Sequence, residues 1–199
     1  MKIEIFTKFT GIDRNGNIIA ERKEERANSL VDGFIAWLQC QAGTTASTYG
    51  TVASIKKTNG NTATMQNEVG SMLWCAGGTV GGVGDSTTGI VVGTGTAAVT
   101  ITDYNLNTKI ENGTGAGQLS YEAEVRPAVG HTTSGGLSYF ILRRTVLNGT
   151  ESTITINEVG YIIWIWDSEK YLIDRTLPTP FPVPASTGAI IDYKWQISV

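Results

Sequence analysis

Apolar and polar side chains alternate with a period of two residues at the C-terminal end of the chain. The apolar members of this pattern are Ile191, Tyr193, Trp195, Ile197 and Val199. Such alternation is typical of a β-strand that has one face in a core and the other in water. Further segments of strand character follow one another from residue 89 onward, at a spacing of about 10–15 residues with turn residues between them. They are residues 119–126, 137–146, 153–160, 161–166 and 171–174. The sequence therefore predicts a mainly β fold, an antiparallel β-sandwich of jelly-roll or immunoglobulin-like type.

In the segment 119–126 the alternation also predicts which side chains are buried. The apolar positions are Leu119, Tyr121, Ala123 and Val125, and the positions between them include Glu122 and Glu124. We expect the first set to face the core and the second to face solvent.

A β-hairpin is predicted for residues 1–27. Apolar residues alternate up to Phe9, and the sequence Asn15-Gly16 separates them from a second apolar run that begins at Ile18. Because Asn-Gly accepts the two positive φ angles of a type I′ turn, we expect that turn here.

One N-terminal amphipathic α-helix is predicted within residues 28–43. Ser29 and Asp32 have the spacing of a capping box, and Gly43 is placed to end the helix. The apolar side chains that share one face of this helix are Leu30, Val31, Phe34, Ile35 and Leu38. We expect this face to be buried against the sheet.

The length of 199 residues fits a single β-sandwich domain over residues 1–199. Within it, residues 44–88 are rich in Gly, Thr, Ser and Asn, and we expect long loops with short strands there, one of them around residues 51–55. Residues 89–199 hold the main strands.

Composition narrows the classes of function. The formal net charge is −3, which provides no field to hold a polyanion, so we expect no direct binding of nucleic acid. The single histidine, His131, excludes a zinc site built from several histidines. No apolar run approaches the roughly 18 residues that a membrane helix requires, and the N-terminus lacks the apolar stretch of a signal peptide. We expect no cofactor, no metal and no membrane partner.

Two cysteines, Cys40 and Cys75, have the neighbours of ordinary buried residues. Free thiols are favoured over a disulfide bond, although the sequence leaves the pairing open.

Two motifs formally match known functional sites, but the residues around them do not support such a site. Gly93, Gly95 and Ala98 formally match a dinucleotide-binding fingerprint, but residues 99–102 are a β-branched run rather than the start of a helix. A glycine-rich turn is therefore favoured. His131 lies close to Ser134, yet no Gly-x-Ser-x-Gly elbow presents a nucleophile, so we expect a histidine at a loop tip. The sequence predicts no enzyme and no catalytic residue.

Four of the five prolines lie within residues 177–185. Proline fixes φ and removes a hydrogen-bond donor, so this segment should run extended along a sheet edge. One interpretation is a connector that protects the edge of its own sheet. The other is an arm that docks on a neighbouring subunit, with Phe181 as its anchor. The candidate subunit-contact residues are Pro178, Pro180, Phe181, Pro182 and Pro184. We expect loops 43–71 and 76–88 and residues 176–185 to lie at or near subunit contacts.

Several segments resemble a family of virion structural proteins of tailed bacteriophages and related viruses. Residues 28–38 are similar to the N-terminal helix of that family. The other similar segments are residues 89–96, 101–104, 106, 110, 115–121, 144–145, 156–160, 172–177, 183–184 and the closing strand. The resemblance covers most of the chain outside residues 43–85 and includes no catalytic motif.

The resemblance implies a non-enzymatic β-sandwich built into a virus particle that is assembled in the host cytoplasm. Its partners would be copies of itself and other virion proteins, and its place would be on the capsid, as a decoration or minor capsid protein, or at the tail. The alternative is a carbohydrate- or receptor-binding sandwich, an adhesin or tail-fibre module that binds surface glycans. In that case aromatic rings would stack on sugars, the candidates being Trp164, Trp166, Tyr171 and Trp195.

Overall fold

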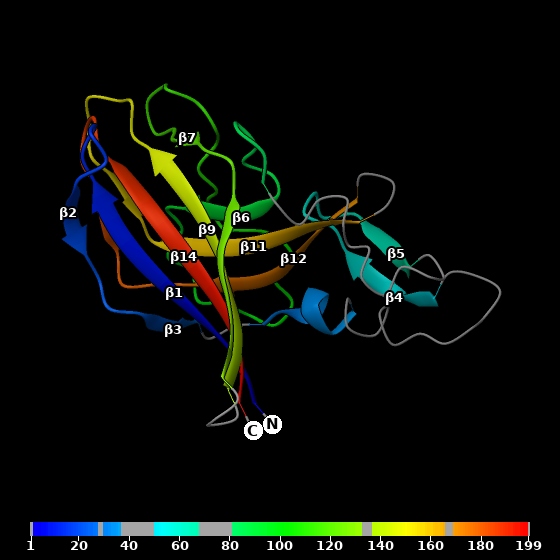
Figure 1. Cartoon of the computed structure of the whole chain (residues 1–199). Coiled ribbons are helices and arrows are strands. Elements are labelled where there is room, and N and C mark those ends of the chain that lie inside the picture. The colour runs from blue at the N-terminus through cyan, green and yellow to red at the C-terminus, as the bar shows by residue number, and fades with distance from the viewer. Residues whose placement is uncertain are drawn as a thin grey trace.

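The computed structural model describes residues 2–27, 30–36, 50–67, 81–132, 137–165 and 169–198. The described chain is mainly β, and its strands pair in antiparallel sheets (Figure 1). The strands are β1 (Lys2–Ile12), β2 (Ile18–Glu21), β3 (Glu25–Ala27), β4 (Gly50–Lys56), β5 (Thr62–Asn67), β6 (Gly89–Gly93), β7 (Ser120–Tyr121), β8 (Val125–Thr132), β9 (Leu137–Leu147), β10 (Ile154–Ile156), β11 (Glu158–Ile165), β12 (Glu169–Thr176), β13 (Phe181–Val183) and β14 (Gly188–Ser198).

The first and last strands of the chain are neighbours at the centre of the largest sheet. β1 pairs with β14 along its whole length, from Lys2 opposite Ser198 to Ile12 opposite Gly188. β9 pairs with the other side of β14 over the same length. β2 and β3 extend the sheet beyond β1, and β7 and β8 extend it beyond β9. Residues 2–27 thus contribute a central strand to this sheet, besides the hairpin that β1 forms with β2.

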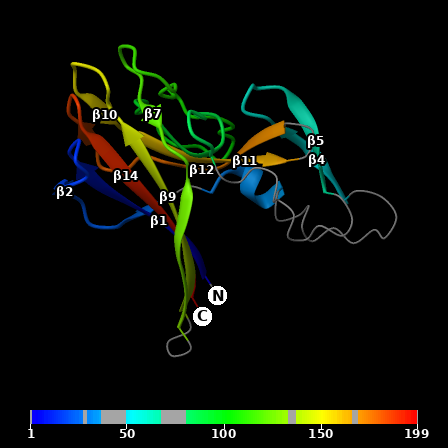
Figure 2. The same cartoon turned by 45° about the horizontal axis from the view of Figure 1, so that its top comes forward.

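A second sheet, in the order β12-β11-β6, crosses one face of the large sheet (Figures 1 and 2). The two sheets share one core, in which the ring of Tyr161 on β11 stacks on Tyr193 of β14 with centroids 5.8 Å apart. A two-stranded ribbon of β10 and β13 adds to this core, while the β4–β5 hairpin stands out to one side of it (Figure 2).

The turn of the first hairpin differs from the type I′ prediction. Gly16 has a φ of 82°, but Asn15 has no positive φ, since Ser186 is the only such non-glycine residue in the described ranges. The turn is held instead by the carboxylate of Asp13, which accepts hydrogen bonds from the backbone N–H groups of Asn15 and Asn17 at 2.8 and 2.9 Å. This Asx-type arrangement needs only one left-handed residue.

Residues 32–36 are helical, whereas Leu30 forms an isolated β-bridge with Asp174, so the helix begins later than predicted. Residues 28–29 and 37–43 lie outside the described residues. Val31 and Phe34 are buried as expected, but Ile35 is 59% exposed, so its predicted burial is wrong. The helical turn contacts β12 through Gly33, where an added Cβ would lie 2.0 Å from the carbonyl oxygen of Leu172.

The predicted alternation over residues 119–126 is correct only for its first half. Leu119 and Tyr121 are fully buried, but Ala123 and Val125 are exposed and Glu124 is 6% exposed. The chain leaves β7 after Tyr121 and enters β8 at Val125, and the Glu124 carboxylate accepts a hydrogen bond from the backbone of Ile90. Because the chain passes from one strand to another between Tyr121 and Val125, the expected alternation does not continue across this break, and Glu124 is buried instead of Ala123 and Val125.

Candidate functional site

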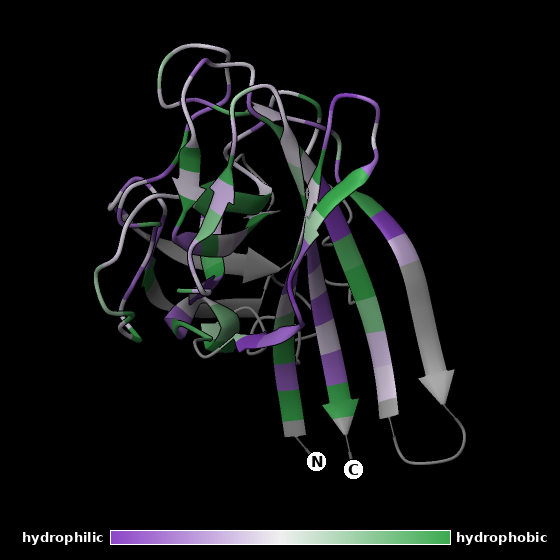
Figure 3. Cartoon of the chain, turned by 90° about the vertical axis from the view of Figure 1, so that its left-hand side faces the viewer, coloured by the Kyte–Doolittle hydropathy of each residue, from purple (hydrophilic) through white to green (hydrophobic). Residues whose placement is uncertain are grey.

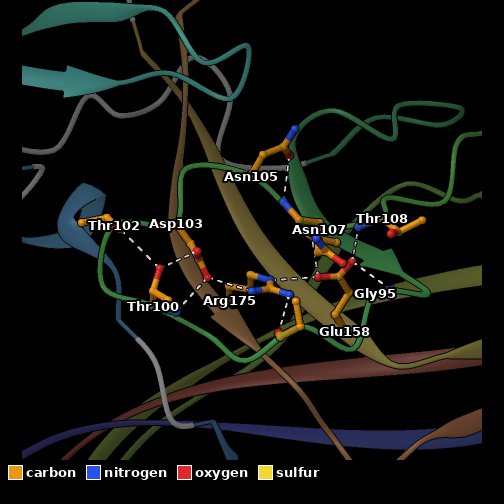
Figure 4. Close-up of polar contacts among 11 residues, drawn as sticks. Gly95, Thr100, Thr102, Asp103, Asn105, Asn107, Thr108, Glu158 and Arg175 are labelled. Atoms are coloured by element: carbon orange, nitrogen blue, oxygen red, sulfur yellow. Dashed lines mark hydrogen bonds and ion pairs between the residues drawn. The ribbon is translucent and has the colours of Figure 1, made fainter.

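The first buried charge cluster joins Arg175 of β12 to Glu158 of β11 (Figure 4). Nε of Arg175 donates to Glu158 Oε2, and Nη1 donates to Asp103 Oδ2, both at 2.8 Å. The Glu158 oxygens also accept three backbone N–H groups, from Gly95 at 3.1 Å, Asn107 at 2.9 Å and Thr108 at 2.6 Å. The cluster therefore fastens the long segment 94–108 to the second sheet.

The glycine-rich sequence at residues 93–95 belongs to this cluster. An added Cβ on Gly93 or Gly95 would lie 2.5 or 2.4 Å from Glu158 Oε1. The segment that follows, residues 94–103, contains no helix. The glycines therefore let the backbone approach an internal carboxylate, as expected of a turn rather than of a dinucleotide site.

The second cluster surrounds Arg144 of β9, whose side chain is fully buried. Its guanidinium donates to five backbone carbonyl oxygens, at 3.1 Å to Glu122 and between 2.5 and 2.9 Å to the others. These are the carbonyls of Gly82, Asp85, Thr88 and Ile90. The guanidinium also lies over the ring of Tyr121, 4.7 Å from its centroid. Four of the five acceptors lie within residues 82–90, so one side chain fixes that loop and the start of β6.

Two carboxyl groups border the Arg144 cluster. Oε2 of Glu124 accepts the Ile90 N–H at 2.8 Å, while Oε1 is buried and has no hydrogen-bond partner among the described residues. Burial raises the pKa of Glu124 to about 7. Asp85 behaves in the opposite way: although burial acts to raise its pKa, hydrogen bonds from Thr87 and Thr88 hold that pKa below its ordinary value.

The third cluster lies between the two sheets. The hydroxyl of Tyr193 on β14 donates to Oδ2 of Asp174 on β12. Asp174 is fully buried, and its Oδ1 has no hydrogen-bond partner among the described residues. Burial raises the pKa of Asp174 to about 7, against which the Tyr193 hydrogen bond acts.

These three clusters are buried, and most of their hydrogen bonds join side chains to backbone groups of long loops. A buried charge with such partners rigidifies the segments that it contacts. The sequence-based prediction missed all of these residues. No local signal marks them, because β9 and β12 also carry other charged side chains such as Arg143 and Lys170, and their partners lie far away in the sequence.

The proline-rich segment packs against other parts of the same chain. β13 pairs with β10, with Phe181 opposite Ile156. Phe181 is 3% exposed, and its ring stacks on Phe9 of β1 with centroids 5.1 Å apart. Arg22 donates to the carbonyl oxygen of Pro180 at 2.7 Å. The Phe181 side chain therefore belongs to the core, and this burial speaks against its role as a surface anchor.

The prolines themselves divide into two groups. Pro178 is buried, whereas Pro180, Pro182 and Pro184 are exposed. The contact of these three exposed residues with a neighbouring subunit stays a prediction.

Replacing Phe181 by leucine should lower the free energy of unfolding by about 1–2 kcal/mol, because the stacked ring contact with Phe9 is lost. Urea denaturation of the purified protein measures this loss. Thr179→Ala, at an exposed position two residues away, is the control and should stay within about 0.5 kcal/mol of the parent. If the Phe181 variant and the parent had equal free energies of unfolding, the packing of this segment in the core would be refuted.

Other predicted residues are placed as follows. His131 lies in β8 opposite Ser138 of β9, so its prediction as a loop-tip residue is wrong. Cys40, Cys75 and Trp166 lie outside the described residues. Tyr171, a candidate for stacking on a sugar, is 1% exposed and packs in the core.

The large sheet extends past the second sheet as an arm, which lies at the lower end of Figure 3 beside the two termini. We define the sheet arm as residues 3–5 of β1, 138–140 of β9 and 195–197 of β14, which pair in register. Along β14 the core-facing positions change from fully buried Tyr193 through partly buried Trp195 to Ile197, which is 43% exposed. The arm thus carries core-type side chains beyond the core.

The comparisons with known proteins found no match, neither to a family model nor to a curated protein or a solved structure. In the part of the chain that the structure describes, no helix has the length and apolar character to cross a membrane. Within the same ranges, no three His, Cys, Asp or Glu side chains gather into a group that could hold a metal ion.

Proposed function

We propose that this chain is a non-enzymatic structural component of a virus particle, folded as an antiparallel β-sandwich and acting through contacts between subunits. The observation that carries the proposal is the sheet arm, on which Phe140 and Ile197 are 41% and 43% exposed. Exposed apolar groups that adjoin one another mark association surfaces more often than isolated ones do. The sequence resemblance to virion structural proteins supports the same class.

The buried clusters fit this role. Arg144 donates to backbone carbonyl oxygens of the loop 82–90. Arg175 donates to the carbonyl oxygen of Ala97 and to Glu158, whose carboxylate accepts backbone N–H groups of the loop 94–108. Loops held in one conformation lose less entropy when they contact a neighbour, so contacts between subunits form at lower cost. Both arginines lie in segments that carry the resemblance.

The copy number of the protein in purified particles tests the proposal. Quantitative mass spectrometry of particles from the virus that encodes this chain should find the protein at a fixed number of copies. Hundreds of copies indicate capsid decoration, and a handful indicates a tail or fibre position. Absence from purified particles contradicts the proposal.

The carbohydrate-binding alternative receives less support from the aromatic residues. Tyr171 is in the core, and the indole N–H of Trp195 is buried. A sugar site combines an exposed ring with accessible hydrogen-bond donors, which Trp195 does not offer.

A further inference from the structure

Asparagine is followed by glycine at several places in the chain, and an asparagine in this setting can lose its side-chain amide without an enzyme. The pairs are Asn15-Gly16, Asn59-Gly60, Asn112-Gly113 and Asn148-Gly149. Glycine has no Cβ to shield its backbone nitrogen, so that nitrogen can approach the side-chain carbonyl carbon of the preceding asparagine. The pairs are equivalent in sequence, but their surroundings in the folded chain differ.

Asn148 is held firmly by the fold. The residue is 1% exposed, and its amide nitrogen donates to the carbonyl oxygens of Ser152 and Val183 at 2.8 Å and of Pro184 at 3.2 Å. Turning this side chain toward the nitrogen of Gly149 would break these hydrogen bonds. Loss of the Asn148 amide therefore requires local unfolding.

Asn59 and its glycine are less restricted. Asn59 is exposed, but its Oδ1 accepts a hydrogen bond from the backbone N–H of Asn61 at 2.9 Å. An added Cβ on Gly60 would lie 3.5 Å from the ring of Tyr104, so the turn packs against that ring.

The surroundings of Asn112 are more crowded. Its Oδ1 accepts a hydrogen bond from the backbone N–H of Tyr121 at 3.0 Å. An added Cβ on Gly113 would lie 2.3 Å from Oε1 of Gln118. A change at this pair therefore disturbs the contacts that lead into β7.

Asn15 lies in the turn between β1 and β2, at the end of the large sheet away from the two termini (Figure 1). Asn15 is exposed, and its side chain forms no hydrogen bond with any residue that the structure describes. An added Cβ on Gly16 would meet nothing within 4 Å. The N–H of Gly16 donates to the carbonyl oxygen of Asp13 at 3.1 Å, and this bond in an exposed turn can open without any change in the core.

We propose that Asn15 is a site of autocatalytic deamidation in the folded chain. The backbone nitrogen of Gly16 attacks the side-chain carbonyl carbon of Asn15 and closes a cyclic imide. The side-chain nitrogen leaves as ammonia and takes with it the proton of the attacking amide. Water then opens the imide at either of its carbonyl groups, which gives aspartate or isoaspartate. The reaction consumes water and needs no oxidant, metal or second protein.

The product changes the turn in which it forms. Either acid adds a negative charge near Asp13, whose carboxylate accepts the backbone N–H groups of Asn15 and Asn17. Isoaspartate also lengthens the backbone within this turn. We therefore expect deamidation to weaken the pairing of Ile12 with Ile18 at the start of β2. The site goes beyond the proposed function, since it requires the folded chain and not its assembly.

Peptide mapping of the full chain after incubation at mildly alkaline pH tests the proposal. Cleavage after lysine releases residues 9–23, and mass spectrometry with fragmentation locates each conversion of an amide to an acid. In the folded protein, conversion at Asn15 should be at least about tenfold faster than at Asn148, which reacts only in locally unfolded molecules. In concentrated urea, where the fold no longer distinguishes the pairs, the rates should be similar.

Asn15→Gln is the matched control. It keeps an amide at the same position, but the longer side chain must close a larger and less favourable ring, so the acidic form of the peptide 9–23 should disappear. Asn17 lies in the same peptide and is followed by the β-branched Ile18, so it should keep its amide in both proteins. Circular dichroism shows whether the variant is folded.

Three results would overturn the proposal. If Asn15 keeps its amide in the folded protein and loses it in urea, the turn protects the residue. If Asn15 and Asn148 react at similar rates in the folded protein, the fold does not select the site. A conversion in residues 9–23 that persists in Asn15→Gln belongs to Asn17. The copy number in particles affects none of these results, so the proposed function and this site fail independently.

Discussion

Replacing Arg144 by methionine is expected to lower the free energy of unfolding by about 3–5 kcal/mol, the cost of breaking a buried charged network by removing one partner. Methionine fills a similar volume but leaves five carbonyl oxygens without their donor. Arg144→Lys should not restore stability, because three donors on a single nitrogen cannot reach acceptors arranged around a planar fork. Urea denaturation measures both losses.

The neighbouring arginine provides the matched control. Arg143 lies on the same strand with its side chain on the opposite face, partly exposed and paired to Asp192 at 2.6 and 2.8 Å. Arg143→Met should cost about 1 kcal/mol or less, as for other exposed ion pairs. Hydrogen exchange should show loss of protection within residues 82–90 only for Arg144→Met. Equal losses for the two variants would refute the idea that Arg144 organises the loop.

The long strands were predictable because their burial follows one period. Buried side chains alternate with partly exposed ones over residues 142–146 of β9 and 189–193 of β14, and the predicted segments overlap the observed strands. A side chain that packs against a second layer imposes this pattern directly on the sequence.

The charge clusters were not predictable, because each depends on partners that are distant in the sequence. Arg175 contacts Asp103 across 72 residues, and Arg144 contacts Gly82 across 62. Nothing local distinguishes these arginines from residues on a solvated strand face. The reversal at Glu124 has the same origin, since that carboxylate accepts a hydrogen bond from Ile90 of β6, 34 residues earlier.

The proline-rich segment shows a different limit. Alternating prolines correctly predicted an extended segment, and β13 is such a segment at the edge of a two-stranded ribbon. Proline spacing restricts the backbone but does not say which side of it meets the core. The stacking of Phe181 on Phe9, 172 residues apart in the chain, decides that side.

Stability is expected to fall as the pH rises from about 5 to about 8, by about 3 kcal/mol for each of two buried carboxyl groups. The pKa values of Glu124 and Asp174 are raised to about 7 in the folded chain, from ordinary values of 4.5 and 3.8. Between these limits the folded chain keeps protons that the unfolded chain has lost. Raising the pH therefore favours unfolding throughout this window, and the loss is complete above the folded-state pKa.

Neutral variants isolate the two groups. Glu124→Gln and Asp174→Asn cannot ionise, so each should flatten the dependence of the unfolding free energy on pH between about 5 and 8. Urea denaturation at several pH values measures this slope. A His131→Gln background removes the only histidine of the chain, a residue type whose ordinary pKa lies within this window.

Asp13→Asn provides the control for this experiment. Hydrogen bonds from Asn17 lower the pKa of the exposed Asp13, so this group stays ionised throughout the window and its loss should leave the slope unchanged. Asp85 and Asp103 also have lowered pKa values, and the stability that they contribute is lost only on acidification below about pH 4. The protein should therefore be most stable near about pH 5, between the two sets of carboxyl groups. A stability that rises from pH 5 to pH 8 would show that Glu124 and Asp174 are ionised in the folded chain and find partners there.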